Sequence, residues 1–278
     1  MIEAIASFDG RIAKVQGPAR SGKTEALVRR CACLVRGGAA PETILVETSS
    51  AAAAQAFRRR LRRALGPDLQ HAADDVHVRT ALETCVAVLD APAARAATGR
   101  VPRLLNEAEY NFCLEDMKTL GQPIRRLRKM LDFFYRQMSD LEPRDSWLAG
   151  GEEEAVLSHL ERVLASRGAM LAQEAPSLCA AYLRSDAGEG VRGSYAYVLC
   201  DDFQNMSRAE QTCLCLLADR QLIACGNPNQ QQAARPSFPC AQGFAQFDAR
   251  RRDAAVFTLS GAHGNPPHPP FADRPSRT

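Results

Sequence analysis

The sequence predicts an α/β fold in which helices cover a parallel β-sheet and an all-helical subdomain interrupts it. Short apolar segments alternate with helical segments over residues 1–84, and this alternation returns over residues 190–263. Between them, residues 85–189 offer no convincing strand and repeat apolar side chains at helical spacing. The simplest organisation is one sheet domain in two parts, with the helical subdomain inserted between them.

The first part of the sheet domain is expected to follow a β-α-β-α-β order. Its predicted strands are three short apolar segments, residues 11–16, 43–47 and 76–79. Helices are expected between them, one ending at residue 36 and one over residues 51–65. A glycine pair ends the first helix and a Gly-Pro step ends the second. This order is typical of parallel strands joined by helical crossovers.

The insertion and the second part of the sheet domain follow. In the insertion, apolar residues from Ile124 to Leu141 recur every three or four positions, as on one face of a helix. The second part is expected to contain a helix over residues 208–217 and strands over residues 195–200, 221–225 and 256–259. Residues 264–278 form a proline-rich tail that is expected to be disordered.

The composition excludes several classes of protein. Of 278 residues, 46% are hydrophobic and 24% are charged, which is ordinary for a globular protein and excludes a wholly disordered chain. No apolar run approaches the ~18–20 residues that span a bilayer. The first residues also lack the basic start and apolar core of a secretory signal. We therefore expect a cytoplasmic protein with no membrane partner.

Ten cysteines are present, and none of them forms a CxxC pair. They are expected to be reduced thiols. Two CxC pairs, Cys31/Cys33 and Cys213/Cys215, leave a zinc site as one interpretation. Buried thiols that behave as small apolar residues are the interpretation that the pattern favours.

The segment GPARSGKT matches the phosphate-loop pattern GxxxxGK[ST] in full, between a predicted strand and a predicted helix. Its backbone N–H groups and the helix N-terminus would surround phosphates. Lys23 would reach the β- and γ-phosphates, and the Thr24 hydroxyl would ligate Mg²⁺. The sheet is thus predicted to be of the P-loop NTPase class, with ATP and Mg²⁺ as cofactors. The candidate binding residues are Gly17, Pro18, Ala19, Arg20, Ser21, Gly22, Lys23 and Thr24.

Two aspartates, Asp201 and Asp202, directly follow the apolar strand YAYVLC. A P-loop needs an acidic partner at the end of a neighbouring strand to hold Mg²⁺ and to polarise water. Asp201 would serve the metal, and Asp202 would orient or activate the attacking water. A helix N-cap region before Ser207 is the alternative, and the P-loop upstream favours the acidic partner.

Five segments resemble, in the same order, the motifs of UvrD/Rep-type superfamily 1 DNA helicases. They are residues 17–24 for motif I, 44–61 for motif Ia, 76–89 for motif Ib, 197–211 for motif II and 222–231 for motif III. The resemblance covers about residues 12–259, and the helical insertion falls where this family has its 1B subdomain. It implies a RecA-like sheet domain, the N-terminal ATP-binding half of such a helicase.

The resemblance also implies roles for individual residues. Asp202 would stand in for the catalytic glutamate of the family, and Gln230 would match the motif III glutamine that senses the γ-phosphate. Lys23 is the third candidate catalytic residue. The hydroxyl residues that would match contacts to the backbone of single-stranded DNA are Thr48, Ser50 and Thr80. Two alternatives remain, because Gln204 and Gln230 could be surface amides and such hydroxyls often cap turns.

Arginines are dense from residue 58 to residue 63, on the helix predicted after the motif Ia strand. Arg59, Arg62 and Arg63 are spaced i, i+3 and i+4 and so share one face of that helix. They are candidate contacts to DNA phosphates. A solvated basic face is the alternative.

Departures from the family pattern predict weak hydrolysis. Asp202 is one methylene shorter than glutamate, Asn227 stands where an aspartate is usual, and the segment after Leu259 supplies no arginine. The second RecA-like domain is expected to be missing, so unwinding would require a second motor domain or a helicase partner. We expect a weakly hydrolysing ATPase domain that binds single-stranded DNA.

Two other functions compete with this expectation. A degenerate helicase paralogue could act as a nucleotide-responsive DNA- or protein-binding module without useful turnover. A small-molecule kinase with a helical lid would also combine a P-loop with an insertion, but the segments that resemble motifs Ia and II argue against it.

Overall fold

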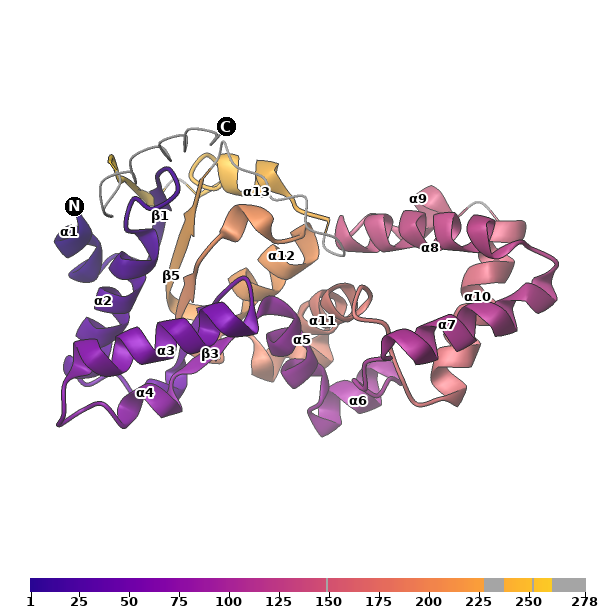
Figure 1. Cartoon of the computed structure of the whole chain (residues 1–278), viewed down its shortest axis with the longest axis horizontal. Helices are drawn as coiled ribbons and strands as arrows, with labels where there is room; N and C mark the ends of the chain where they lie inside the picture. The colour runs from indigo at the N-terminus through magenta and orange to yellow at the C-terminus, as the bar shows by residue number, and fades with distance from the viewer. Residues whose placement is uncertain (149, 228–237, 252, 262–278) are drawn as a thin grey trace, which may run out of the picture.

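The centre of the molecule is a six-stranded sheet in the order β3-β2-β4-β5-β1-β6. The computed structural model describes residues 1–148, 150–227, 238–251 and 253–261. Every neighbouring pair of strands is parallel, which confirms the predicted α/β P-loop class (Figure 1). The strands are β1 (Ile12–Gln16), β2 (Ile44–Glu47), β3 (His77–Arg79), β4 (Tyr195–Cys200), β5 (Ala218–Gly226) and β6 (Ala255–Thr258).

Helices cover both faces of this sheet. Successive side chains of a strand point to opposite faces, so Leu199 of β4 packs in one apolar cluster and Val198 in another. The helices on the Leu199 face are α1 (Ile2–Ala6), α2 (Lys23–Arg36), α3 (Ala51–Leu65) and α4 (Ala72–Asp75). The opposite face packs against α12 (Arg208–Leu217) and α13 (Ala241–Ala245). Because both faces of the sheet are buried, the strands have nearly continuous apolar sequences.

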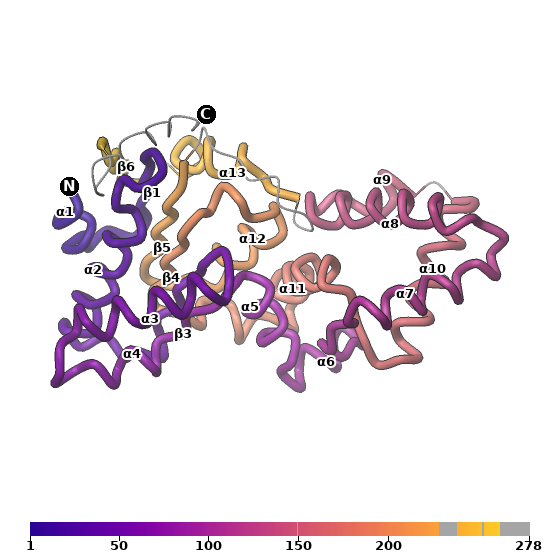
Figure 2. The backbone as a smooth tube through the Cα atoms, viewed as in Figure 1, coloured from indigo at the N-terminus to yellow at the C-terminus, as the bar shows by residue number. Residues whose placement is uncertain are grey.

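A helical arm extends from one side of the sheet (Figure 2). Its helices are α5 (Ala81–Leu89), α6 (Pro92–Thr98), α7 (Glu107–Asp116), α8 (Ile124–Ser139), α9 (Arg144–Trp147), α10 (Glu152–Ser166) and α11 (Ala175–Arg184). One apolar cluster joins α7, α8 and α10, and another joins α5, α6 and α11 to α12. The described part of the arm contains no strand, and its one β-type pairing is an isolated bridge between Leu104 and Met170. An all-helical subdomain is therefore inserted into the sheet fold, as predicted.

Short 3-10 helices join several of these elements. They are η1 (Pro41–Thr43), η2 (Met117–Leu120), η3 (Asp186–Val191) and η4 (Phe203–Asn205). The predicted bounds of α3, β4 and α12 agree with the structure. β5 begins at Ala218, earlier than predicted, because its next two residues are exposed and give no apolar signal. Residues 264–278, the expected tail, lie outside the described residues.

Candidate nucleotide-binding site

The predicted phosphate loop joins β1 to α2 at the carboxyl edge of the sheet. Two glycines are required there for different reasons. Gly22 has φ 95°, in the left-handed region that favours glycine, and it caps α2. A Cβ atom on Gly17 would lie 2.7 Å from both the Leu259 carbonyl oxygen and Ser21 Oγ. The loop can therefore pass close to β6 only because Gly17 has no side chain.

The interior of the loop fits an anion. Lys23 is only 8% exposed, and its Nζ donates to the carbonyl oxygens of Gly17 at 2.9 Å and Pro18 at 2.7 Å. Ser21 Oγ is buried and has no hydrogen-bond partner. A buried hydroxyl without a partner costs free energy, and a phosphate oxygen would satisfy it. The α2 N-terminus adds backbone N–H groups directed at the same space.

Thr24 and Asp201, the two predicted metal ligands, lie in direct contact. Thr24 Oγ1 donates to Asp201 Oδ2 at 2.5 Å, although the two residues are 177 positions apart in the chain. β5 lies between β1 and β4 in the sheet. Thr24 can contact Asp201 across the end of β5 because Thr24 lies in the first turn of α2 and not on β1. A hydroxyl and a carboxylate at this separation fit the oxygen-ligand preference of Mg²⁺.

Asp201 is held at the end of β4 by the neighbouring strand. Its N–H donates to the Glu47 carbonyl oxygen of β2 at 2.9 Å. Burial raises the pKa of the Asp201 carboxyl, and the nearby Asp202 charge raises it further, while the hydrogen bond from Thr24 opposes the shift. A bound cation would favour the charged form of this carboxyl.

Asp202 and Gln204 continue the site toward β5. Asp202 has φ 53°, and its Oδ1 lies 3.5 Å from Gln204 Nε2. Gln204 Oε1 accepts from the Asn227 backbone N–H at 3.2 Å. Gln204 is 2% exposed, so the alternative of a surface amide is wrong for this residue. Gln230 lies outside the described residues.

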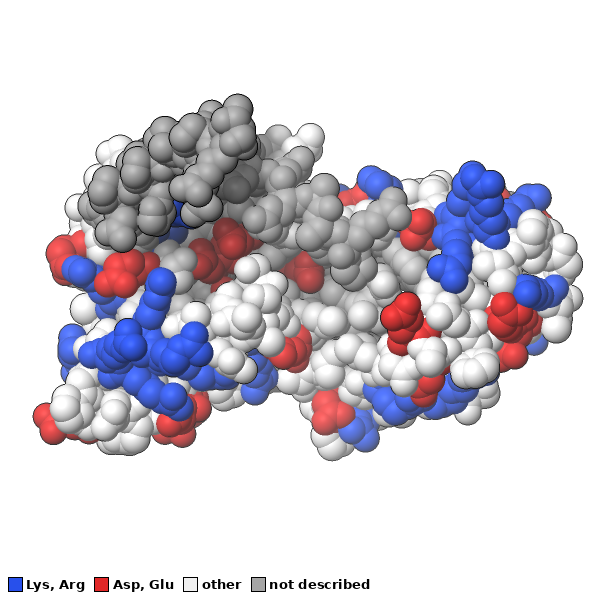
Figure 3. All heavy atoms as spheres, viewed as in Figure 1, with Lys and Arg blue, Asp and Glu red and all other residues white. Residues whose placement is uncertain are grey.

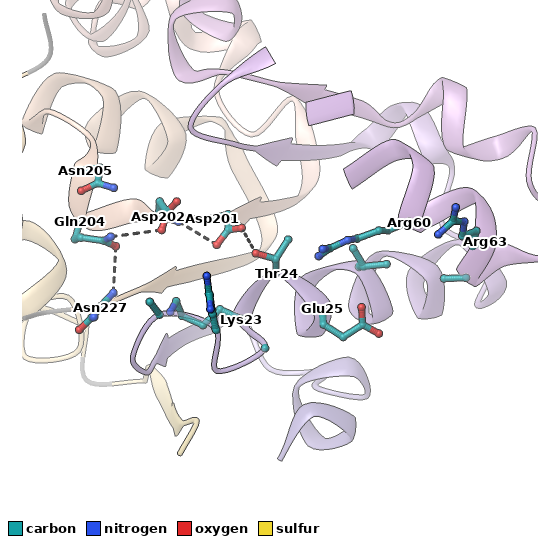
Figure 4. Close-up of a pocket in the computed structure, with 15 residues that line it drawn as sticks. Lys23, Thr24, Glu25, Arg60, Arg63, Asp201, Asp202, Gln204, Asn205 and Asn227 are labelled. Atoms are coloured by element: carbon teal, nitrogen blue, oxygen red, sulfur yellow. Dashed lines mark hydrogen bonds between the residues drawn. The ribbon is translucent and has the colours of Figure 1, made fainter. Parts of the chain in front are cut away.

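An open cleft of about 930 Å³ lies above these groups, and α3 contributes Arg60 and Arg63 to its wall. Figure 4 shows Arg60 extending from α3 toward Thr24, opposite the acidic pair. Arg60 is not among the residues predicted from the sequence, and Arg63 is predicted there as a contact to DNA. Helical spacing alone could have indicated that Arg60 and Arg63, at i and i+3, share a face. It could not indicate that this face borders the phosphate loop.

The other arginines of α3 take different positions. Arg62 forms an ion pair with Asp74 of α4, and Arg58 Nη2 donates to the Val78 carbonyl oxygen at 2.7 Å. Arg59 is exposed. Figure 3 shows basic side chains gathered over α3. The predicted set of Arg59, Arg62 and Arg63 is thus divided among solvent, an ion pair and the cleft.

The three predicted hydroxyl contacts all take part in local hydrogen bonds. Thr48 Oγ1 donates to the Ser50 carbonyl oxygen at 3.2 Å. Ser50 Oγ caps α3 by accepting from the Ala53 N–H, and Thr80 forms a capping box with Glu83 at the start of α5. The hydrogen bonds of all three side chains in this structure are therefore those of the alternative interpretation, in which such hydroxyls cap turns and helices.

Thr48 and Thr80 also line a second cleft of about 340 Å³ between the sheet edge and the arm. Ser139 of α8 and Pro176 of α11 contribute the arm side. Asp201 and Asp202 line both this cleft and the larger one. The acidic pair thus stands between two clefts.

The family model described as UvrD/REP helicase N-terminal domain matches residues 2–231. Comparison with curated proteins gives no match. Among the described residues, no helix combines the length and the apolar character that a membrane crossing requires. The family match spans the phosphate loop, the acidic pair and the whole helical arm.

Proposed function

This chain belongs to the UvrD/REP helicase N-terminal domain family, and we propose that it binds ATP with Mg²⁺, hydrolyses the nucleotide slowly and holds single-stranded DNA. Membership in the family implies an ATP-binding, helicase-like function. The observation that carries the finer proposal is the 2.5 Å contact between Thr24 and Asp201 beside the buried Lys23 ammonium group.

The residues that would hold the cofactor are those of the larger cleft. Loop N–H groups and Ser21 Oγ would bind phosphate oxygens, and Lys23 would exchange its two carbonyl partners for the β- and γ-phosphates. Thr24 and Asp201 would hold Mg²⁺, which neutralises phosphate charge when bound. The proposed cofactor therefore meets positive charge on the loop side and oxygen ligands on the strand side.

Asp202 is the proposed base or water-orienting residue. Its carboxylate is one methylene closer to the backbone than that of a glutamate, so a water held by it would lie farther from the γ-phosphate. Its 3.5 Å separation from Gln204 Nε2 is at the long limit of a hydrogen bond, so this contact restrains the carboxylate weakly. Slow turnover is the expected consequence, even with Arg60 in the cleft.

Single-stranded DNA is proposed to follow the second cleft. Thr48 and Thr80 lie at the carboxyl ends of β2 and β3, and both line this cleft together with Ser139 of the arm. The cleft also contacts Asp201 and Asp202, so DNA there would lie beside the nucleotide site. Unwinding would further require a second motor domain, supplied by a partner or by a longer polypeptide.

Thermal unfolding tests the nucleotide proposal directly. A ligand at one hundred times its Kd stabilises the folded state by about 2.7 kcal/mol. For a domain of this size class, that free energy raises Tm by about 5–10 °C. ATP with Mg²⁺ should produce this rise, and Lys23→Ala should abolish it. Lys118→Ala is the matched control, because Lys118 is exposed on η2, pairs with the exposed Glu115 and does not line the cleft.

An unchanged Tm of the wild-type protein at millimolar ATP would refute nucleotide binding. Hydrolysis measured with and without single-stranded DNA then separates the two remaining functions. DNA-stimulated turnover supports the ATPase, whereas a Tm rise without any turnover favours the nucleotide-responsive binding module.

A further inference from the structure

Three cysteine thiols meet in the interior, at the junction of the helical arm and the sheet domain. Cys85 lies on α5, Cys179 on α11 and Cys213 on α12. Their Sγ atoms all lie within 4.8 Å of one another. The three residues are 0–1% exposed, and they are spaced 94 and 34 positions apart in the chain. No short sequence motif joins them, so only the fold brings them together.

This cluster differs from the other cysteines of the chain. All ten are free thiols, and these three form the one group of three metal-ligating side chains within ligand distance among the described residues. The CxC partner Cys215 and both members of the Cys31/Cys33 pair are not part of it. The surrounding side chains are apolar, with Leu89, Met170 and Leu183 in the same buried cluster, and Cys213 Sγ donates to the Pro176 carbonyl oxygen at 3.4 Å.

We propose that these three thiols form a three-coordinate site for a soft monovalent metal ion of the Cu(I) type. Soft sulfur ligands, both charged thiolate and neutral thioether sulfur, are the ligand type that selects such ions. Structural zinc is almost always four-coordinate, and no fourth His, Cys, Asp or Glu ligand joins the group among the described residues.

The charge of the buried site supports a monovalent ion. Entry of the ion replaces one thiol proton, so that M⁺ and three R–SH groups give M(SR)(HSR)₂ and one H⁺ released to solvent. Three metal–sulfur bonds form, one S–H bond breaks, and no atom changes oxidation state. The loaded site is neutral, and a neutral site avoids the cost of burying a net charge in an apolar cluster.

The three thiols lie on three helices that a bound ion would connect. α5 follows β3, α11 is the last helix of the arm, and α12 follows the acidic pair and η4. An ion bound to all three would therefore cross-link the root of the arm to the helix that leaves the nucleotide site. Because the unfolded chain has no such preformed site, binding would stabilise the fold.

The test uses the full chain, anaerobic and reduced, with Ag(I) and then Cu(I) as probes in the presence of a competing thiol ligand. Wild-type protein should retain one equivalent of either ion, release one proton and melt about 5–10 °C higher at one hundred times Kd. X-ray absorption of the copper form should count three sulfur neighbours.

Cys179→Ala should weaken binding by more than about 100-fold, since loss of partners that merely support a ligand already costs about 10–100-fold. Cys31→Ala is the matched control, because Cys31 is equally buried, on α2, and lies outside the cluster. Should Cys179→Ala fail to fold, Cys85→Ala removes a ligand from a different helix. Equal retention of the ion by the cluster and control variants, or a copper site with two sulfur neighbours, would overturn the proposal.

Discussion

Replacing Arg60 by alanine is expected to weaken the binding of ATP and to leave the binding of ADP nearly unchanged. Arg60 lies on the exposed face of α3 and lines the cleft opposite Asp201 and Asp202. Its side chain extends toward Thr24 (Figure 4), which is proposed to help hold Mg²⁺ beside the phosphates. An arginine on this side of the cleft can meet the γ-phosphate, which ADP lacks.

The size of the effect depends on the exposure of Arg60. A hydrogen bond to a charged group contributes about 1.5–3 kcal/mol to stability. Since Arg60 is exposed, screening by water favours the lower limit. A loss of about 1.4 kcal/mol corresponds to a tenfold change in Kd. We therefore expect the Kd for ATP to rise about tenfold in Arg60→Ala, and hydrolysis to fall by at least the same factor.

Arg59→Ala is the matched control for this substitution. Arg59 is the adjacent residue on the same helix, equally exposed, and it does not line the cleft. Both substitutions remove a surface arginine, so each should change the free energy of unfolding by less than about 0.5 kcal/mol. Titration of the wild type and both variants with fluorescent ATP and ADP analogues measures the six affinities. Equal losses in the two variants, or equal losses for ATP and ADP, would refute the assignment of Arg60 to the γ-phosphate.

Three further outcomes follow from the structure. Asp202→Glu should raise the rate of ATP hydrolysis if the reach of the carboxylate limits it, and a lower rate would show that the short side chain is matched to its site. Removing Arg59, Arg62 and Arg63 together should flatten the slope of log K for single-stranded DNA against log salt concentration by about 0.7, the value for one phosphate. Only Arg59 is counted, because Arg62 pairs with Asp74 and Arg63 faces the cleft. A flattening of about 2 would instead indicate that all three contact DNA. Burial raises the pKa of Glu47, so the folded state binds the carboxyl proton more tightly than the unfolded state does. The stabilisation from this proton is lost as the pH rises above the ordinary glutamate range. In urea unfolding, the stability of Glu47→Gln should therefore increase relative to wild type between pH 5 and pH 8, and a constant difference between the two proteins over this range would contradict the prediction.

The local signals in the sequence predicted most of the sheet and the phosphate loop. GPARSGKT carries its chemistry within eight residues, and the burial of both sheet faces makes β2 and β4 readable as apolar runs. The fourteen-residue α2 could be predicted because glycines bound it at both ends. In each case the signal and the structure it predicts lie within one short segment.

Contacts between distant segments could not be predicted in the same way. Whether Arg60 faces DNA, solvent or the nucleotide depends on the rotation of α3 about its axis and on its distance from α2. The buried position of Gln204 depends on β5, whose end supplies the Asn227 N–H that it accepts from. The meeting of Cys85, Cys179 and Cys213 requires three helices from both sides of the insertion to pack together. These features arise from tertiary packing, which residue spacing does not encode.

The two clefts are connected through the carboxyl edge of the sheet. Asp201 donates its N–H to the carbonyl oxygen of Glu47, the last residue of β2, at 2.9 Å. Thr48 directly follows β2 and donates its N–H to the Arg79 carbonyl oxygen of β3, also at 2.9 Å. Thr80 follows Arg79 and caps α5, so backbone hydrogen bonds link the strand ends that carry the proposed metal ligand and both hydroxyl residues of the second cleft. Moving one strand of a parallel sheet alone would break the evenly spaced hydrogen bonds to its neighbours. A displacement of Asp201 would therefore strain the hydrogen bonds that hold the edge proposed to face DNA.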